Sequence, residues 1–268
     1  MEKTIITTSR KINFEDEILA KKFSEKLGIE FVRREDFSLE KMKKIFCAEN
    51  ILVVKNNSLT LMTSDGELFF HPNTAHLRIK NLREGKGDRL IDAAGLCEGS
   101  EILDCTLGLG SDAIVESFIV GEKGKIVALE VNPLLAEIVR HGMKNFSDDS
   151  PRILDAMRRV EIITANYLDY LKNTPTNSFD VVYFDPMFRR PIKKSNGINP
   201  LRSLADHSPL TIEAVHEAER VAREKVIMKE STNSGEFERL GFEIAAGGKY
   251  SSISFGIICT KKIFSAGN

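Results

Sequence analysis

The stretch Glu101-Ile-Leu-Asp-Cys-Thr-Leu-Gly-Leu-Gly-Ser-Asp-Ala113 decides the fold. Its first half, residues 101–105, is an apolar run that predicts a buried strand, and Gly108 and Gly110 predict a tight turn that leads into a helix. Glu130 closes the next apolar run, 22 residues after Gly108. A carboxylate at that strand end can accept both hydroxyls of a ribose that lies on the turn. The stretch therefore predicts a site for an adenosine-type ligand.

The spacing Gly108-x-Gly110-x-x-Ala113 also fits the dinucleotide fingerprint, a short pattern that often occurs by chance. Two acidic neighbours help to discriminate between the ligands. Asp104 precedes the glycines and can meet a cationic amino group, whereas Asp112 would place a negative charge beside a pyrophosphate at the helix N-terminus. We therefore expect a cofactor that carries an amino acid.

Beyond this stretch the chain alternates apolar strand runs with helical segments, which predicts a parallel sheet covered on both faces. The predicted strands are Glu101 to Cys105, Lys125 to Glu130, Val160 to Thr164, Asp180 to Phe184, Lys225 to Lys229, Phe242 to Ala246 and Ile253 to Thr260. The last two runs leave no room for a crossover helix and should pair antiparallel. An α/β, mainly parallel seven-stranded sheet that ends in an antiparallel hairpin resembles the Rossmann-like class I methyltransferase fold, whereas a dinucleotide fold ends in a parallel strand.

The N-terminal part of the chain predicts a smaller α/β unit. Residues 12–27 have the spacing of an amphipathic helix, residues 30–33 predict a strand, and Ser38 can cap a helix that continues to Phe46. Residues 51–54 and 59–62 flank a turn and predict a hairpin. We therefore divide the chain into a small N-terminal α/β subdomain, residues 1–74, and a cofactor-binding domain, residues 75–268.

Composition limits the class of protein. The chain has 268 residues, 42% of them hydrophobic, and a net charge of −1, so it predicts a folded protein without a uniformly basic surface. No apolar run approaches the length of a membrane span, and the N-terminus lacks the pattern of a secretory signal, so we expect a cytoplasmic protein. The four cysteines are scattered singly and predict reduced core thiols, and no pattern predicts a metal site.

The sequence Asp185-Pro-Met-Phe188 begins where the predicted strand of residues 179–184 ends, at the edge of the sheet where Glu130 should also lie. Asp185 can accept a hydrogen bond from an exocyclic amine, Pro186 leaves nearby carbonyls without a competing amide at that residue, and Phe188 offers a ring for base stacking. These groups predict a holder for an amine on a flat heterocycle, oriented to attack a methyl group.

Four segments together resemble the RsmJ-like S-adenosylmethionine-dependent methyltransferases, across about residues 75–260. They are Asp104-Cys-Thr-Leu-Gly-Leu-Gly-Ser-Asp-Ala113, Leu129-Glu-Val-Asn-Pro133, Val182-Tyr-Phe-Asp-Pro-Met-Phe188 and Val226-Ile-Met-Lys229. The N-terminal 70 residues resemble a Gram-positive branch of relatives. The resemblance implies S-adenosyl-L-methionine as the cofactor, with contacts at Ser111, Asp112, Glu130, Val131, Asn166, Tyr167 and Asp185. It also implies that the substrate is the N2 amine of a guanine in the RNA of the small ribosomal subunit.

A basic segment follows the tetrad. Residues 189–205 contain no Asp or Glu and carry the five positive side chains of Arg189, Arg190, Lys193, Lys194 and Arg202. A long basic loop of this kind favours contact with RNA phosphates, although a solvated loop is the simpler alternative. Lys229, at the end of a predicted strand, is a further candidate for substrate contact.

Other functions remain open at this level. The same site can methylate adenine N6 or a small aromatic amine, the glycine turn can serve a nicotinamide-dependent oxidoreductase, and the fold can persist in a non-catalytic RNA-binding module. The sequence does not indicate an oligomeric state.

Overall fold

The computed structural model describes residues 3–11, 13–147, 150–186, 199–202, 204, 208–246 and 251–260. These residues form two compact units. Unit 1 contains the described parts of Met1–His71, Pro133–Ser147 and Ile192–Ala205, and unit 2 contains those of Pro72–Asn132, Asp148–Pro191 and Asp206–Asn268. The boundary expected between residues 74 and 75 stays a prediction.

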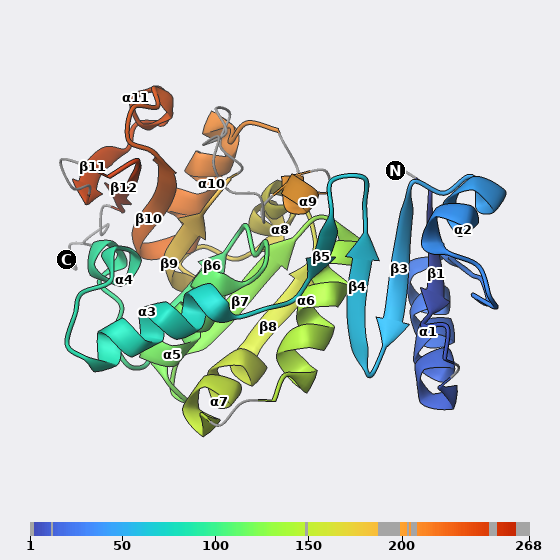
Figure 1. Ribbon diagram of the computed structural model, residues 1–268. Coiled ribbons are helices and arrows are strands. Elements are labelled where there is room, and N and C mark those ends of the chain that lie inside the picture. Colours follow the sequence, from blue (N-terminus) through green and yellow to red (C-terminus); the bar gives the residue numbers. More distant parts are fainter. Residues whose placement is uncertain are drawn as a thin grey trace, which may run out of the picture. The chain divides into compact units, whose positions relative to one another are not determined.

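Unit 1 is built on a five-stranded sheet with the order β2-β1-β3-β4-β5. Figure 1 labels β1, β3, β4 and β5 of this sheet. Its strands are β1 (Thr4–Thr8), β2 (Glu30–Phe31), β3 (Asn50–Lys55), β4 (Ser58–Met62) and β5 (Glu67–Phe69), and its helices are α1 (Phe14–Leu27), α2 (Leu39–Phe46), α6 (Pro133–Asn145) and α9 (Asn199–Arg202). β1 is parallel to β2 and β3, whereas β3, β4 and β5 pair antiparallel in succession.

Local signals explain most of the elements in unit 1. Asn13 caps α1 by accepting a hydrogen bond from the Glu15 amide, Ser38 caps α2 in the same way, and Gly28 ends α1 in the left-handed region at φ 65°. The hairpin of β3 and β4 lies where the sequence predicts it. β1 was not predicted, because its five residues become a strand only by pairing with segments far along the chain.

Unit 2 is built on a seven-stranded sheet with the order β11-β12-β10-β9-β6-β7-β8. Its strands are β6 (Glu101–Asp104), β7 (Lys125–Glu130), β8 (Val160–Thr164), β9 (Phe179–Phe184), β10 (Ala222–Ser231), β11 (Glu243–Ala246) and β12 (Ile253–Cys259). Its helices are α3 (Asn73–Arg83), α4 (Arg89–Ala94), α5 (Ser111–Val120), α7 (Pro151–Arg159), α8 (Tyr167–Asn173), α10 (Ile212–Val221) and α11 (Glu236–Leu240).

The pairing within unit 2 confirms the predicted fold class. β8, β7, β6, β9 and β10 pair in parallel, and β12 is antiparallel to both β10 and β11. The sequence did not indicate that β12 lies between β10 and β11. The chain reaches the outer position first, through α11, and β12 then fills the gap.

The sheet of unit 2 is buried on both faces. Leu103, Val182 and Val226 belong to a hydrophobic core that also includes apolar residues of α8, α10 and α11. Ile102 and Ile227, whose side chains alternate with these along the strands, are also fully buried. Both faces are therefore covered, as predicted for a parallel sheet.

The described residues include no helix that is long and apolar enough to cross a membrane. The cysteines are free, as predicted, but the expectation that they lie in the core is wrong for three of them. Only Cys105 is buried, whereas Cys47, Cys97 and Cys259 are exposed.

Candidate functional site

The carboxyl ends of the central parallel strands in unit 2 gather the polar residues of the candidate site. Asp104 ends β6 and pairs in register with Tyr183 of β9. Met228 of β10 pairs with Phe184, so Lys229 and Asp185 follow side by side where β9 ends. Because β6, β7, β9 and β10 are parallel neighbours, residues at their carboxyl ends meet at one edge of the sheet although they are far apart in the chain.

The glycine turn and Glu130 lie together, as the sequence predicts. Gly108 and Gly110 both have positive φ values, 51° and 77°, which a residue with a side chain adopts only with strain. The Gly108 amide donates a hydrogen bond of 3.3 Å to Glu130 Oε2, and the Asn132 amide donates one of 2.9 Å to Glu130 Oε1. These contacts fix the Glu130 carboxylate beside the turn. A Cβ placed on Gly108 would lie no nearer than 3.9 Å to any neighbouring atom, so the space above this glycine is open.

Asp104 has an unusual environment for a carboxyl group. Its side chain is only 1% exposed, and Oδ1 accepts a hydrogen bond of 2.8 Å from the Thr106 amide. Oδ2 is buried and has no hydrogen-bond partner among the described residues. Burial, with the nearby negative charges of Asp112 and Asp185, raises the pKa of Asp104 to about 8. A cationic group placed at Oδ2 would remove this penalty and return the carboxyl to its ionised form.

Asp112, in the first turn of α5, lies in a cluster of compensating groups. Its Oδ1 pairs with Arg78, and its Oδ2 accepts hydrogen bonds from the Tyr183 hydroxyl at 3.0 Å and from Lys229 Nζ at 3.1 Å. Burial alone would raise the pKa of Asp112, but Lys229 and Arg78 hold it well below its usual value. The sequence argument against a pyrophosphate relied on the negative charge of Asp112. In the structure, Arg78 and Lys229 largely balance that charge.

Asp185 and Lys229 form the other half of this cluster. Lys229 Nζ donates to Asp185 Oδ2 at 2.7 Å, and the Asp185 amide donates to Thr106 Oγ1 at 2.6 Å. Burial raises the pKa of Asp185 above its usual value, and the positive charge of Lys229 opposes that change. Burial alone would lower the pKa of Lys229, but Asp112 and Asp185 raise it. Asp185 and the half-buried Pro186 follow β9 directly, so the structure places them beside the glycine turn.

Several residues of the site were not singled out from the sequence. Arg78 of α3 binds Asp88 through two hydrogen bonds, of 2.7 and 2.9 Å, in addition to its contact with Asp112. Thr106 connects Asp104 to Asp185. Glu116 of α5 is a further carboxyl whose pKa is raised by burial, as are those of Asp104 and Asp185. Thr106 lay inside a quoted motif, but no local pattern indicated that Arg78 reaches α5.

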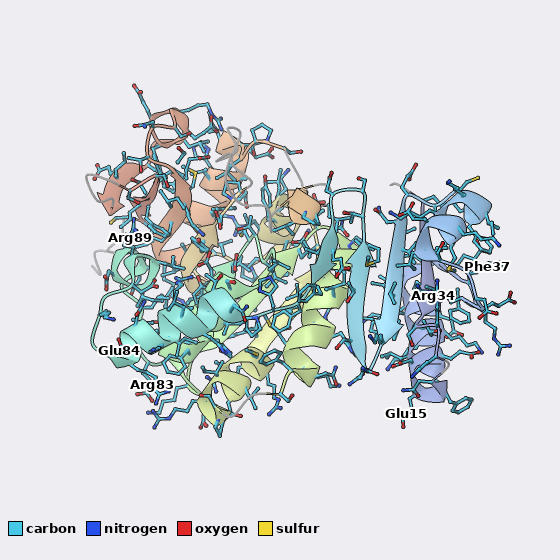
Figure 2. The ribbon with its side chains drawn as sticks, viewed as in Figure 1. Glu15, Arg34, Phe37, Arg83, Glu84 and Arg89 are labelled. Atoms are coloured by element: carbon cyan, nitrogen blue, oxygen red, sulfur yellow. The ribbon has the colours of Figure 1, made fainter. Side chains whose placement is uncertain are left out.

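Arg83 and Arg89, two basic residues that follow Arg78 in the sequence, are more exposed than Arg78. Figure 2 shows Arg83 and Glu84 where α3 ends, and Arg89 at the start of α4. Arg89 donates hydrogen bonds to the Ser251 hydroxyl and, at 3.3 Å, to the Ile253 carbonyl. Arg78 and Arg89 therefore have structural contacts within unit 2.

The remaining predicted cofactor residues lie at strand and helix ends. Ser111 is the first residue of α5. Val131 follows β7 and is 40% exposed, which is unusual for a large apolar side chain beside a buried carboxylate. Asn166 caps α8 by accepting hydrogen bonds from the amides of Leu168 and Asp169, so its Oδ1 is already engaged. Tyr167 packs edge-on against Phe184, with ring centroids 5.6 Å apart.

Five of the predicted substrate contacts lie outside the described residues. They are Phe188, Arg189, Arg190, Lys193 and Lys194. Their contact with substrate therefore stays a prediction.

The residues of the site fit the cofactor that the resemblance implies. The orphaned Asp104 oxygen matches the ammonium group of an amino acid, and the fixed Glu130 carboxylate matches a ribose diol. The exposed Val131 offers an apolar surface next to that carboxylate. Among the described residues, no group of three or more His, Cys, Asp or Glu side chains is arranged to hold a metal ion.

Comparisons with known proteins agree with this chemistry. A family model described as "Putative SAM-dependent methyltransferase" matches residues 35–247. A Bacillus subtilis (strain 168) protein with the name "Uncharacterized protein YpiP" is 40% identical over 257 residues, which cover 96% of this chain and 99% of that protein. Ribosomal RNA small subunit methyltransferase J of Buchnera aphidicola subsp. Schizaphis graminum is 26% identical over 189 residues, which cover 66% of this chain and 74% of that protein.

A solved structure supports the fold independently. The SAM-dependent methyltransferase NGO1261 from Neisseria gonorrhoeae matches with a TM-score of 0.60 at 15% sequence identity, over 96% of each chain. That likeness confirms the class I methyltransferase architecture. The family match over most of the chain goes further: this protein belongs to the SAM-dependent methyltransferases, and its cofactor is S-adenosyl-L-methionine.

Proposed function

We propose that this protein methylates the exocyclic N2 amine of a guanine in the RNA of the small ribosomal subunit. The relatives named ribosomal RNA small subunit methyltransferase J support the class of substrate. The tetrad Asp185-Pro-Met-Phe188 supports an amine on a flat ring as the acceptor. The basic side chains after the tetrad support a polyanion as the molecule that carries this ring.

In this proposal, residues at the carboxyl ends of β6 and β7 would hold the cofactor. Asp104 accepts the ammonium group of its amino-acid part, and Glu130 accepts the ribose hydroxyls. Gly108 and Gly110 let the backbone approach the ligand closely, while Val131 contacts the adenine. The other expected cofactor contacts are Ser111, Asp112, Asn166, Tyr167 and Asp185.

S-adenosyl-L-methionine, when bound, supplies a methyl group on a positively charged sulfur. Asp185 accepts a hydrogen bond from the guanine N2 amine and turns the nitrogen lone pair toward that methyl group, while Pro186 borders the amine and Phe188 stacks on the base. A nitrogen–carbon bond forms as the sulfur–carbon bond breaks. The nitrogen then loses a proton, which Asp185 can accept because burial raises its pKa.

Lys229 acts in this proposal through Asp185. Its ammonium group, 2.7 Å from Asp185 Oδ2, fixes the orientation of the carboxylate and remains protonated because two carboxylates raise its pKa. In this proposal the RNA phosphates are contacted by the basic side chains that follow the tetrad, namely Arg189, Arg190, Lys193 and Lys194. Phosphate contacts of this kind bind RNA without reading its sequence, so the choice of guanine rests on the site around Asp185.

The proposal rests chiefly on the pairing of Asp185 with Lys229 beside the glycine turn, because a carboxylate oriented in this way can accept a hydrogen bond from the substrate amine. The test compares modified nucleosides, by mass spectrometry, in small-subunit RNA from cells with and without the protein. We expect N2-methylguanosine at one position to disappear and to return with the wild-type gene but not with Asp185→Ala. Loss of N6-methyladenosine instead, or an unchanged profile, would contradict the proposed substrate.

An assay with purified protein tests the RNA substrate and the catalytic role of Asp185 separately. With radiolabelled S-adenosyl-L-methionine, wild-type protein should label small-subunit RNA from the deleted strain and not RNA from the parent strain. Asp185→Ala should transfer no label even at cofactor concentrations that calorimetry shows to saturate the variant. Full activity of Asp185→Ala would reject its role as the group that positions the amine.

A further inference from the structure

Unit 1 contains a cavity that the methyl-transfer site does not use. Its volume is about 360 Å³, within the range typical of ligand sites. It is lined by the turn between β3 and β4 with the first three residues of β4, by the last residue of β5 and the residue after it, and by the C-terminal half of α6 with the two residues that follow. Among the described residues that line it there is no Asp, Glu, Lys or Arg, so the cavity suits an uncharged part of a ligand.

Aromatic rings form one part of the wall. Phe69, the last residue of β5, is 44% exposed although its side chain is large and apolar. Phe70 and Phe146 meet edge-to-face, with ring centroids 6.0 Å apart. Gly142 of α6 has no side chain where Phe70 lies, and a Cβ there would collide with that ring. The Phe69 ring meets the His71 ring at an interplanar angle of 61°, with centroids 5.5 Å apart, and the exposed part of Phe69 can stack on a flat partner.

Amide groups form another part of the wall, and the backbone that carries them is fixed. Asn56 and Asn57 both have left-handed backbones, at φ 49° and 58°, and their amides donate hydrogen bonds of 3.0 and 3.1 Å to the buried Asp16 carboxylate. His141 Nε2 donates to the Asn57 carbonyl at 2.7 Å. The side-chain amides of Asn56 and Asn57 are exposed and have no partner among the described residues. Each offers a donor and an acceptor, as the edge of a nucleobase requires.

Positive charge lies beside this neutral wall. Lys144 follows His141 by three residues on α6, and Lys22 of α1 precedes Phe23, whose ring packs edge-on against His141 with centroids 5.3 Å apart. Both lysine side chains are exposed, and neither forms an ion pair within the described part of the chain. A neutral pocket with cations at its side is complementary to a nucleotide, whose base is neutral and whose phosphate is negative.

We propose that this cavity in unit 1 holds one unpaired base of the RNA substrate, with the base stacked on Phe69, its edge hydrogen-bonded to Asn56 and Asn57, and its phosphates near Lys22 and Lys144. The proposal rests on the proposed RNA substrate and gives unit 1 a task distinct from methyl transfer. Single-stranded segments are the form in which base edges of RNA are accessible, so a loop or bulge is the expected element.

The test measures binding of a fluorescent 20-nucleotide single-stranded RNA of mixed sequence to the full-length protein, by anisotropy at several salt concentrations. Phe69→Ala should weaken binding by about 5- to 100-fold, as expected for loss of one stacked base, without changing the salt dependence. Lys22→Gln and Lys144→Gln should each reduce the slope of log K against log salt by about 0.7. Phe14→Ala is the matched control, because Phe14 is also in unit 1, is 76% exposed, and does not line the cavity.

A second readout covers the case in which Phe69→Ala loses its fold. RNA containing 4-thiouridine, irradiated on the wild-type protein, should cross-link to peptides that contain residues 56–60, 69–70 or 145–147. Two results would overturn the cavity proposal: equal RNA binding by folded Phe69→Ala and wild type, or cross-links that avoid all three peptides. If wild-type protein binds S-adenosyl-L-methionine but no RNA, the proposed RNA substrate itself fails.

Discussion

Replacement of Asp104 by asparagine should stabilise the free protein and weaken its binding of S-adenosyl-L-methionine. Asparagine keeps the shape of the side chain and can still accept the hydrogen bond from the Thr106 amide. It removes the ionisable group whose Oδ2 is buried without a partner. A residue with a purely structural role would leave cofactor affinity unchanged, so a gain in stability combined with a loss of affinity identifies a residue that is strained for function.

The size of the stability effect follows from the raised pKa of Asp104. Its pKa is about 8 in the folded protein, against the ordinary aspartate value of 3.8 in the unfolded chain. Between these two pH values the unfolded chain has lost the proton and the folded protein has kept it, so wild-type stability falls as pH rises through this window. At pH 7 the cost is up to about 4 kcal/mol, at 1.36 kcal/mol per pH unit. We expect Asp104→Asn to raise the Tm at pH 7 by several degrees and to flatten its pH dependence between pH 4 and 8.

The size of the binding effect follows from the lost charge. A hydrogen bond between an ammonium group and an ionised carboxylate contributes about 1.5 to 3 kcal/mol, so the Kd for S-adenosyl-L-methionine should rise about 10- to 150-fold. Binding to the wild type at pH 7 should also release nearly one proton, because Asp104 must ionise. Calorimetry in two buffers of different ionisation enthalpy measures both quantities.

Glu116→Gln is the matched control for this prediction. Glu116 is a buried carboxyl of the same region, its pKa is also raised by burial, and it is not among the proposed cofactor contacts. Its replacement should raise the Tm at pH 7 and leave the Kd for S-adenosyl-L-methionine within about twofold. A lower Tm for Asp104→Asn than for wild type at pH 7, or an unchanged Kd, would refute the reasoning.

Three further changes test the other contacts. Lys229→Met removes the ammonium group that orients Asp185. Single-turnover methylation should slow by about 100- to 1,000-fold, while the cofactor affinity measured by calorimetry should change by no more than a few-fold. Equal losses of methylation rate and cofactor affinity would contradict a positioning role for Lys229. Glu130→Gln should raise the Kd for S-adenosyl-L-methionine about 10-fold by weakening ribose contacts, and unchanged calorimetry would exclude that contact. Asp16→Ala leaves two turn amides without their acceptor. Hydrogen exchange of the Asn56 and Asn57 amides should accelerate, and the free energy of unfolding of unit 1 should fall by about 2 to 3 kcal/mol. Unaltered exchange would contradict the role of Asp16 in fixing the turn.

The sequence by itself determined the strand, turn and helix around Gly108, the alternating pattern of unit 2 and the tetrad after β9. These features depend on local causes: apolar runs, the backbone freedom of glycine, and helix caps such as Ser38. It also determined that Glu130 and Asp185 share one edge of the sheet, since parallel strands end on the same side. The antiparallel pairing of β11 with β12 could also be predicted, because the short connection between these strands excludes a crossover helix.

Only the tertiary structure decided which distant groups meet. β1 is a strand because it pairs with β2 and β3, and β12 takes its place between β10 and β11 because the chain reaches the outer position first. Arg78 and Lys229 meet Asp112 across 34 and 117 residues of sequence. The raised pKa of Asp104 likewise follows from burial and neighbouring charges. Pairing, burial and electrostatic neighbourhood depend on the packing of segments that are far apart in the chain, so no local pattern encodes them.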